Sequence, residues 1–282
     1  MNDANMVSSK ESIPIPGPKV MLVGGTGSGK THAIRTLVDA GLEVFVIFTE
    51  PGMEVLSDVS SDKLHWHYIA PVNVDWDTLK DSAKKINTMT FKGLAELGDI
   101  NKGKYQEWFE LLTTLSNFTD DRTGVSYGAV DSFGMDKAVV IDSLSGLNVM
   151  AMNLVAGSKP VKSMADWGVA MDNLERLIMK ISTGILCTVV LTAHLERESD
   201  EITGGTINMA ATLGKKLAPR LPRFFSDVIV CRRDGTQFFW STAAINTDTK
   251  ARNVPLSDKI PPDFGRLLAT WKDRQHVATA SA

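Results

Sequence analysis

The chain has 282 residues, of which 43% are hydrophobic and 22% are charged, and its formal net charge at pH 7 is −3. A chain of this length can bury the core of one large α/β domain or of two small ones. A net charge so close to zero excludes a protein that is basic over its whole surface, so any contact with nucleic acid has to come from a local basic patch.

The two cysteines, Cys187 and Cys231, lie in separate apolar runs and lack the close spacing of a zinc or redox motif. We therefore expect both to be buried, reduced thiols. No apolar signal core is present near the N-terminus, and the longest apolar stretch, residues 184–193, is too short to span a bilayer. These features predict a cytoplasmic protein with no membrane partner.

Residues 1–18 form a polar leader that ends in the proline-rich segment Ile13–Pro18. Prolines at this density prevent a helix and favour an extended arm. We expect this leader to be flexible or docked on a partner. A single core domain is predicted to follow over residues 19–272, with a polar tail at 273–282.

An apolar strand at residues 20–23 leads into a glycine-rich segment that precedes a predicted helix at 32–38. The segment has the spacing of a P-loop, with a glycine, four residues, and then Gly-Lys-Thr. Its members are Gly24, Gly25, Thr26, Gly27, Ser28, Gly29, Lys30 and Thr31. The coincidence of strand, spacing and helix predicts a triphosphate-binding loop.

The chemistry of phosphate binding explains this composition. Glycines let the backbone amides of the loop turn inward toward the phosphates, and the helix that follows adds the positive end of its dipole. Lys30 is expected to reach the β- and γ-phosphates, and the Thr31 hydroxyl to bind Mg²⁺.

Two further strands are predicted at residues 42–49 and 63–69, and the first of them ends at Glu50. Helical spacing of apolar residues at 79–89 and 105–112 predicts a helical insert that spans about residues 78–135, with a loop over its last part. We expect the aromatic residues of the insert to be part of the core and not to form a ligand site.

The apolar strand 137–143 carries Asp142 at its end, where an acidic residue beside a P-loop can hold Mg²⁺ through water. A helix at 164–179 and a very apolar strand at 185–193, which ends at His194, follow. Together the segments predict an α/β fold with a mostly parallel central sheet flanked by helices.

Residues 199–210 are polar and contain two adjacent glycines, which predicts a mobile loop. Phe224 and Phe225 lie beside the last of the four cations that follow. These cations are Lys215, Lys216, Arg220 and Arg223. Cations for phosphates and aromatic rings for stacking are the components of a path for single-stranded nucleic acid. A solvated helix face above core phenylalanines is the alternative interpretation.

The last segments are a strand at 238–245, the pair Lys250 and Arg252, and a short helix at 264–271 within the C-terminal part of the chain. From the residues alone, Lys250 and Arg252 are an ordinary exposed pair or a functional one.

The order of these motifs resembles the RecA-like P-loop ATPases. Within that superfamily, residues 192–198, 213–217 and 249–252 resemble the shortened phage NTP-binding proteins, which are single-strand-annealing recombinases of the Sak group. The resemblance covers most of Pro18 to Trp271 and is weakest in the insert.

The resemblance implies a RecA-like P-loop NTPase core that uses ATP and Mg²⁺. It implies that Glu50 orients the attacking water and that His194 stands where relatives carry a γ-phosphate sensor, commonly Gln or Asn. Lys250 and Arg252 would reach the γ-phosphate held by a neighbouring subunit. It further implies assembly into a filament or ring on single-stranded DNA, a single-strand-binding protein as a further partner, and a bacterial host cytoplasm.

Three functions stay open at this point. The first is a DNA-dependent ATPase, a phage recombinase or annealing protein. The second is a P-loop phosphotransferase that acts on a small molecule. The third is a DNA-binding module or hexameric translocase in which ATP acts as a switch with little turnover.

Overall fold

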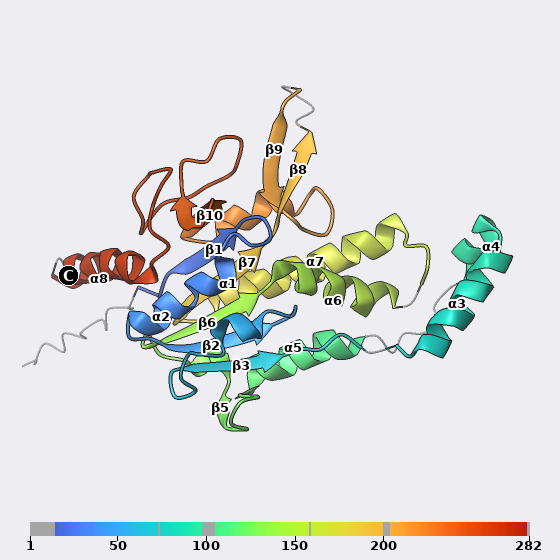
Figure 1. Ribbon diagram of the computed structural model, residues 1–282, viewed down its shortest axis with the longest axis horizontal. Coiled ribbons are helices and arrows are strands. Elements are labelled where there is room, and N and C mark those ends of the chain that lie inside the picture. Colours follow the sequence, from blue (N-terminus) through green and yellow to red (C-terminus); the bar gives the residue numbers. More distant parts are fainter. Residues whose placement is uncertain (1–14, 73, 98–104, 158, 200–203, 281–282) are drawn as a thin grey trace, which may run out of the picture.

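The computed structural model describes residues 15–72, 74–97, 105–157, 159–199 and 204–280. Within this part of the chain the central feature is a seven-stranded sheet with the order β11-β10-β1-β7-β6-β2-β3 (Figure 1). Its strands are β1 Lys19–Val23, β2 Glu43–Phe48, β3 Leu64–Tyr68, β6 Lys137–Asp142, β7 Thr188–Ala193, β10 Asp227–Asp234 and β11 Gln237–Ser241.

All neighbouring strands of this sheet are parallel except β10 and β11, which pair antiparallel at one edge. The inner strands are apolar on both faces, as expected for strands that are covered on both sides. Successive residues of β1 point to opposite faces, so Val20 and Leu22 join one core cluster whereas Met21 and Val23 join the other. The predicted fold, an α/β core with a mostly parallel central sheet flanked by helices, is confirmed.

Helices cover both faces of the sheet. One face carries α1 Lys30–Ala33, α2 Arg35–Asp39 and α8 Phe264–Ala280, and the other carries α5 Gln106–Ser116, α6 Leu144–Ala156 and α7 Met164–Thr183. Short 3-10 helices lie at Met53–Leu56 (η1), Val130–Ser132 (η3) and Ala218–Phe224 (η4). In the described part of the chain, every helix is too short or too polar to span a bilayer.

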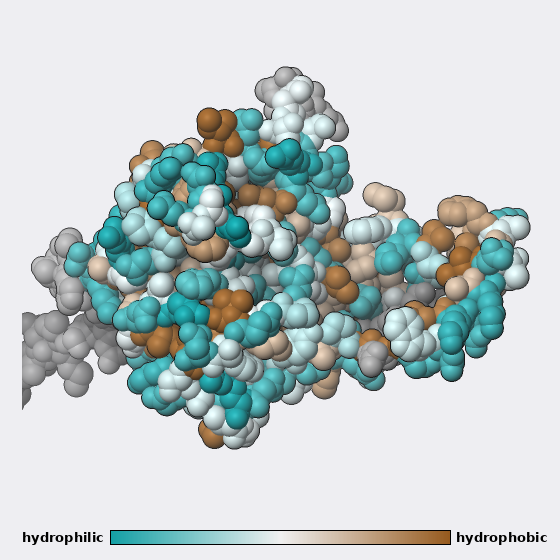
Figure 2. Space-filling view, in the orientation of Figure 1, coloured by the Kyte–Doolittle hydropathy of each residue, from teal (hydrophilic) through white to brown (hydrophobic). Residues whose placement is uncertain are grey.

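Within its described residues, the insert contains a projecting helical arm and a two-stranded hairpin. The arm contains α3 Trp76–Thr88 and α4 Phe91–Glu96 and projects away from the sheet in Figure 1. No residue of either helix is buried, and Trp76 is 79% exposed. Figure 2 shows apolar residues along this arm. The predicted loop at 120–134 contains strand β5 Ser126–Gly128, which pairs with β4 Phe118–Thr119, and η3.

The prediction of a mobile loop at residues 199–210 is wrong for its described part. Strands β8 Leu195–Ser199 and β9 Thr206–Ala210 pair antiparallel and form a hairpin that projects from the core in Figure 1. Residues 200–203 lie outside the described residues. Strand β8 has the sequence Leu-Glu-Arg-Glu-Ser, so it lacks the apolar alternation that identifies a half-buried strand.

The two ends of the described chain lie together on the core. The Trp271 indole donates to the Pro16 carbonyl (3.0 Å), and the Gln275 amide donates to the Ile15 carbonyl (2.6 Å). The end of the predicted leader therefore packs on its own chain, whereas residues 1–14 lie outside the described part. The predicted helix at 264–271 is longer than expected, because α8 runs through the predicted tail to Ala280. The predicted strand at 238–245 ends at Ser241.

Both cysteines are buried free thiols, as predicted. Burial raises the pKa of the Cys187 thiol to about 11 and that of the Cys231 thiol to about 12. Both are therefore protonated and unreactive at neutral pH.

Candidate functional site

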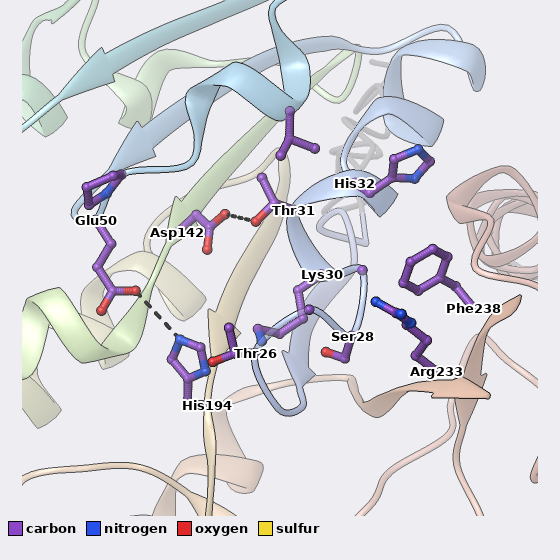
Figure 3. Close-up of a pocket in the computed structure, with 14 residues that line it drawn as sticks. Thr26, Ser28, Lys30, Thr31, His32, Glu50, Asp142, His194, Arg233 and Phe238 are labelled. Carbon is purple, nitrogen blue, oxygen red and sulfur yellow. Dashed lines mark hydrogen bonds and ion pairs between the residues drawn. The ribbon is translucent and has the colours of Figure 1, made fainter. Parts of the chain in front are cut away.

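The P-loop leaves the carboxyl end of β1 at the centre of the sheet. The Gly24 amide donates to the Ala193 carbonyl of β7 (3.1 Å), and a Cβ atom at Gly24 would lie 2.6 Å from the Cys231 carbonyl of β10. Only glycine fits between these two strands. Gly27 and Gly29 take left-handed φ values of 71° and 85°, which turn the loop into α1. The loop lines a cavity of about 690 Å³ (Figure 3).

Lys30 points into the loop that precedes it. Its Nζ atom donates to the carbonyls of Gly24 (2.9 Å) and Gly25 (3.0 Å), and the residue is 7% exposed. Burial lowers the pKa of Lys30, and the charges of Asp142 and Glu50 oppose this change. The buried ammonium provides a strong electrostatic attraction for a polyanion in the cavity.

Ser28 adds a second polar group to the loop. Its hydroxyl is buried, and no group in the described part of the chain hydrogen-bonds it. A buried hydroxyl of this kind needs a partner, and it lines the cavity where a phosphate oxygen would accept its proton. This orphaned donor and the buried ammonium fit a triphosphate.

Thr31 and Asp142 meet at the carboxyl edge of β6. The Thr31 hydroxyl donates to Oδ2 of Asp142 (2.6 Å), and the Thr192 hydroxyl of β7 donates to Oδ1. Hydroxyl and carboxylate oxygens are the ligands that Mg²⁺ prefers, and P-loop sites supply few of them because phosphates and water complete the shell. The pair at the cavity wall therefore fits Mg²⁺, as expected from the sequence.

Glu50 and His194 stand on the same side of the cavity as Asp142 (Figure 3). Oε2 of Glu50 accepts a hydrogen bond from the Ser143 hydroxyl (2.6 Å) and lies 3.7 Å from Nε2 of His194. The structure thus brings Lys30, Thr31, Glu50, Asp142 and His194, all predicted from sequence, to one cavity. Ser143 was not among the predicted site residues.

Thr49 fixes the segment that carries Glu50. Its hydroxyl accepts from the Ser143 amide (2.8 Å) and donates to the Ser143 carbonyl (2.8 Å), which joins the end of β2 to the end of β6. The approach is so close that a Cβ atom on Gly146 of α6 would lie 2.3 Å from the Thr49 hydroxyl oxygen. Glu50 therefore stands on a rigid base.

Three further residues line the opposite side of the cavity, and none of them is among the site residues predicted from the sequence. His32 lies on α1, and Arg233 and Phe238 lie on the hairpin of β10 and β11 (Figure 3). The Phe238 ring covers the P-loop so closely that a Cβ atom at Gly29 would lie 2.8 Å from it. This contact depends on the sheet order, which places β10 beside β1, so no local motif could have indicated it.

Lys250 and Arg252 lie elsewhere. The backbone of Lys250 forms an antiparallel β-bridge with Val228 near the start of β10. The Nζ atom of Lys250 donates to the Phe225 carbonyl (2.7 Å). Burial lowers the pKa of Lys250. Arg252 lines a separate cavity of about 360 Å³, together with Arg223 and Arg274. Neither Lys250 nor Arg252 is among the described residues that line the P-loop cavity, so their action across a subunit interface stays a prediction.

The predicted nucleic-acid cations are exposed, and most of them already face carboxylates. Lys215 pairs with Glu198 of β8 (2.7 Å), while Arg220 and Arg223 both pair with Glu175 of α7. The Arg223 guanidinium also lies over the ring of Phe224. Lys216 is exposed beside them, and Phe225 is buried. Exposed ion pairs of this kind contribute only about 0–1 kcal/mol each, so an anionic ligand such as a phosphate would compete with the carboxylates.

The chain is similar to solved structures and matches one protein family. Among solved structures, the chain is similar to the RadB recombinase (12% identity, 86% of each chain covered, TM-score 0.38). It is also similar to the flagellar accessory protein FlaH from Methanocaldococcus jannaschii (10% identity, 81% of this chain and 78% of that chain, TM-score 0.33). A search of curated proteins finds no match. Residues 16–254, which include the whole P-loop cavity, match the AAA domain family, and the chain belongs to that family.

Proposed function

We propose that this protein is a RecA-like ATPase that hydrolyses ATP on single-stranded DNA, as a phage recombinase or annealing protein of the Sak type. The observation that carries the proposal is the convergence of Lys30, the Thr31–Asp142 pair and the Glu50–His194 pair on one cavity. Membership in the AAA domain family supports nucleotide use, and the resemblance of the later motifs to Sak-group proteins suggests the DNA substrate.

In this proposal each residue has a distinct task. Lys30 and the amides of Gly25 to Gly29 hold the phosphates, with the Ser28 hydroxyl as a further donor. Thr31 and Asp142 would hold Mg²⁺, which when bound neutralises charge on the phosphate oxygens. Glu50 orients and polarises a water molecule, whose oxygen attacks the γ-phosphorus while the bond to the β–γ bridging oxygen breaks, giving ADP and inorganic phosphate.

His194 connects this chemistry to a projecting element. It stands at the cavity, and the next residue, Leu195, begins β8. The Ala211 amide, just after β9, donates to the His194 carbonyl (2.8 Å), and the Asn148 side chain of α6 donates to the Ala211 carbonyl (3.0 Å). A change in the position of His194 on ATP hydrolysis would therefore act at the base of the hairpin, which we propose grips DNA.

DNA binding in this proposal competes with existing ion pairs. Lys215, Arg220 and Arg223 would exchange Glu198 and Glu175 for phosphates, and exposed ion pairs of this type cost little to break. Lys216 would join them. Such binding depends strongly on salt, because each phosphate contact releases a counterion.

We further propose that the protein assembles into a filament or ring. Lys250 and Arg252 lie outside the P-loop cavity of their own chain, so a role at a γ-phosphate requires a second copy. An arginine that reaches a transition state across an interface accelerates phosphoryl transfer by about a thousandfold or more. A single-strand-binding protein is a further proposed partner.

The experiment that tests the function is phosphate release from ATP and Mg²⁺, with and without single-stranded DNA, at low and moderate salt. Stimulation by DNA that weakens as salt rises is the expected result. The Lys215→Ala/Lys216→Ala variant should lose stimulation while its release without DNA stays unchanged. Slow phosphate release that is unaffected by DNA under every condition would refute the DNA-dependent ATPase. A phosphorylated small molecule in place of free phosphate would identify a phosphotransferase.

A further inference from the structure

The P-loop cavity has two chemically different sides. Glu50, Asp142 and His194 stand on one side of Lys30, whereas His32, Arg233 and Phe238 stand on the other (Figure 3). The first side supplies carboxylates and an imidazole, which suit the attack of water at a terminal phosphate. The second side supplies aromatic rings. A nucleoside triphosphate whose γ-phosphate lies at Glu50 would extend its other end toward these rings.

The rings of His32 and Phe238 present nearly parallel faces. Their planes are inclined by 13° and their centroids are 6.3 Å apart. Phe238 is 38% exposed although it packs on Gly29, so part of its ring remains accessible from the cavity. The Arg233 guanidinium lies 5.9 Å from the centre of the Phe238 ring, and its Nε donates to the Gly235 carbonyl.

Packing in the hydrophobic core does not explain the position of Phe238. Phe238 belongs to neither core cluster of the described residues, and its neighbour Trp240 already anchors β11 with 1% exposure. Val55 of η1, which is also exposed, adds a further apolar surface to the cavity wall. Aromatic and aliphatic faces beside a phosphate-binding loop are suited to a flat, apolar ring system.

We propose that Phe238 and His32 form the nucleobase subsite of the P-loop cavity and that they hold the base by its face. This inference rests on the proposed nucleotide-binding function, and it adds the part of the site that binds the nucleoside. Recognition by the ring face is tolerant of base identity, because every base has a π-face. Adenine and guanine nucleotides are therefore both substrates for this subsite.

The test compares ADP, GDP and pyrophosphate in the presence of Mg²⁺, by calorimetric titration of the full chain without DNA. Pyrophosphate carries the phosphates without a base, so it reports on the P-loop alone. Phe238→Ala is expected to weaken ADP and GDP binding by the same factor, about tenfold, and to leave pyrophosphate binding unchanged. Phe238→Trp, which keeps a stacking face, is expected to restore ADP affinity.

Phe109→Ala is the matched control, because Phe109 is an exposed phenylalanine on α5 that does not line this cavity among the described residues. It should bind ADP as the wild type does. Unchanged ADP binding in Phe238→Ala would overturn the proposal, and so would an equal loss of ADP and pyrophosphate, which would indicate damage to the P-loop. A loss confined to ADP would overturn recognition by the ring face.

These outcomes are separate from a failure of the proposed function. A wild-type protein that binds ADP but whose phosphate release ignores DNA would refute the DNA-dependent ATPase and leave the comparison of ADP with pyrophosphate intact. A wild-type protein that binds ADP no more tightly than pyrophosphate would overturn the base subsite itself.

Discussion

Ser143 holds Glu50 in place through a 2.6 Å hydrogen bond from its hydroxyl to Oε2 of the carboxylate. Ser143 is 1% exposed, and its amide and carbonyl are both bonded to the Thr49 hydroxyl. The Ser143 hydroxyl also accepts from the Ser145 amide (3.1 Å) at the start of α6. One buried serine thus ties the carboxylate proposed to orient water to the strand that carries Asp142.

Ser143→Ala should slow turnover with little effect on nucleotide affinity, because it removes a hydrogen bond to Glu50 and no contact to the phosphates. A hydrogen bond to a charged group contributes about 1.5–3 kcal/mol, which corresponds to about a tenfold to hundredfold fall in kcat. Loss of the helix cap would also lower the free energy of unfolding by about 1 kcal/mol. Steady-state kinetics, ADP titration and chemical denaturation measure the three effects.

A double-mutant cycle with Glu50→Gln separates positioning from a general structural defect. If Ser143 acts through Glu50, Ser143→Ala should cost little further turnover in the Glu50→Gln background. Full additivity of the two losses would contradict the positioning role.

Glu50→Gln alone should retain ADP affinity and lose turnover by about 10²–10⁴-fold, because the amide cannot polarise water as a carboxylate does. The variant keeps an oxygen that can accept the Ser143 hydrogen bond, so the fold around Thr49 should be preserved. Phosphate release under single-turnover conditions measures the effect. Turnover near the wild-type rate would exclude Glu50 from the chemical step.

Much of the fold and part of the site follow from local sequence. The P-loop is fixed by spacing and glycine content, and the strands that end at Glu50, Asp142 and His194 are apolar runs long enough to identify. Because these strands are parallel and adjacent to the P-loop strand or near it, their carboxyl ends meet at one edge of the sheet. The prediction of their shared location therefore needed only the sheet order.

Other features depend on contacts between distant segments. Helix α6 is apolar on most of its surface, so it shows little helical periodicity, and the sequence gives weak evidence for it. Phe238 reaches the P-loop only because β10 lies beside β1 and turns back into β11. The pairing of Arg220 and Arg223 with Glu175, 45 and 48 residues away in the chain, is likewise invisible to a local pattern.

Glu175→Gln should raise the affinity for single-stranded DNA if Arg220 and Arg223 contact phosphates. The substitution removes the negative charge that holds both guanidinium groups and keeps the size of the side chain. The dependence of log K on log salt should steepen by about 0.7 for each arginine that gains a phosphate. Fluorescence anisotropy with a labelled oligothymidine at several salt concentrations gives both quantities.

The control for this prediction is Asp172→Asn, which removes the same charge from the same helix but releases Arg176. Arg176 is not among the predicted DNA contacts, so the control should bind DNA with a smaller change in salt dependence. Equal behaviour of the two variants would indicate a general charge effect and would argue against a specific arginine path.

Burial of Lys19 predicts how the free energy of unfolding depends on pH. Lys19 is 7% exposed, and its ammonium donates to the carbonyls of Ile185 (2.7 Å) and Cys187. Burial lowers the pKa of Lys19 to about 8, although the nearby Cys187 thiol acts in the opposite direction. Between this value and the ordinary lysine pKa near 10.5, the unfolded chain binds the proton that the native chain has lost. Within that window, this residue's contribution to stability rises with pH.

The comparison with Lys19→Met isolates this contribution from all other titrating groups. Below pH 8 the difference in free energy of unfolding between the wild type and the variant should be constant. As pH rises from 8 toward 10.5, the wild type should gain up to about 3 kcal/mol relative to the variant. Urea denaturation of both proteins across this range measures the difference. A difference independent of pH would mean that Lys19 keeps an ordinary pKa and that its burial carries no cost to the charged form.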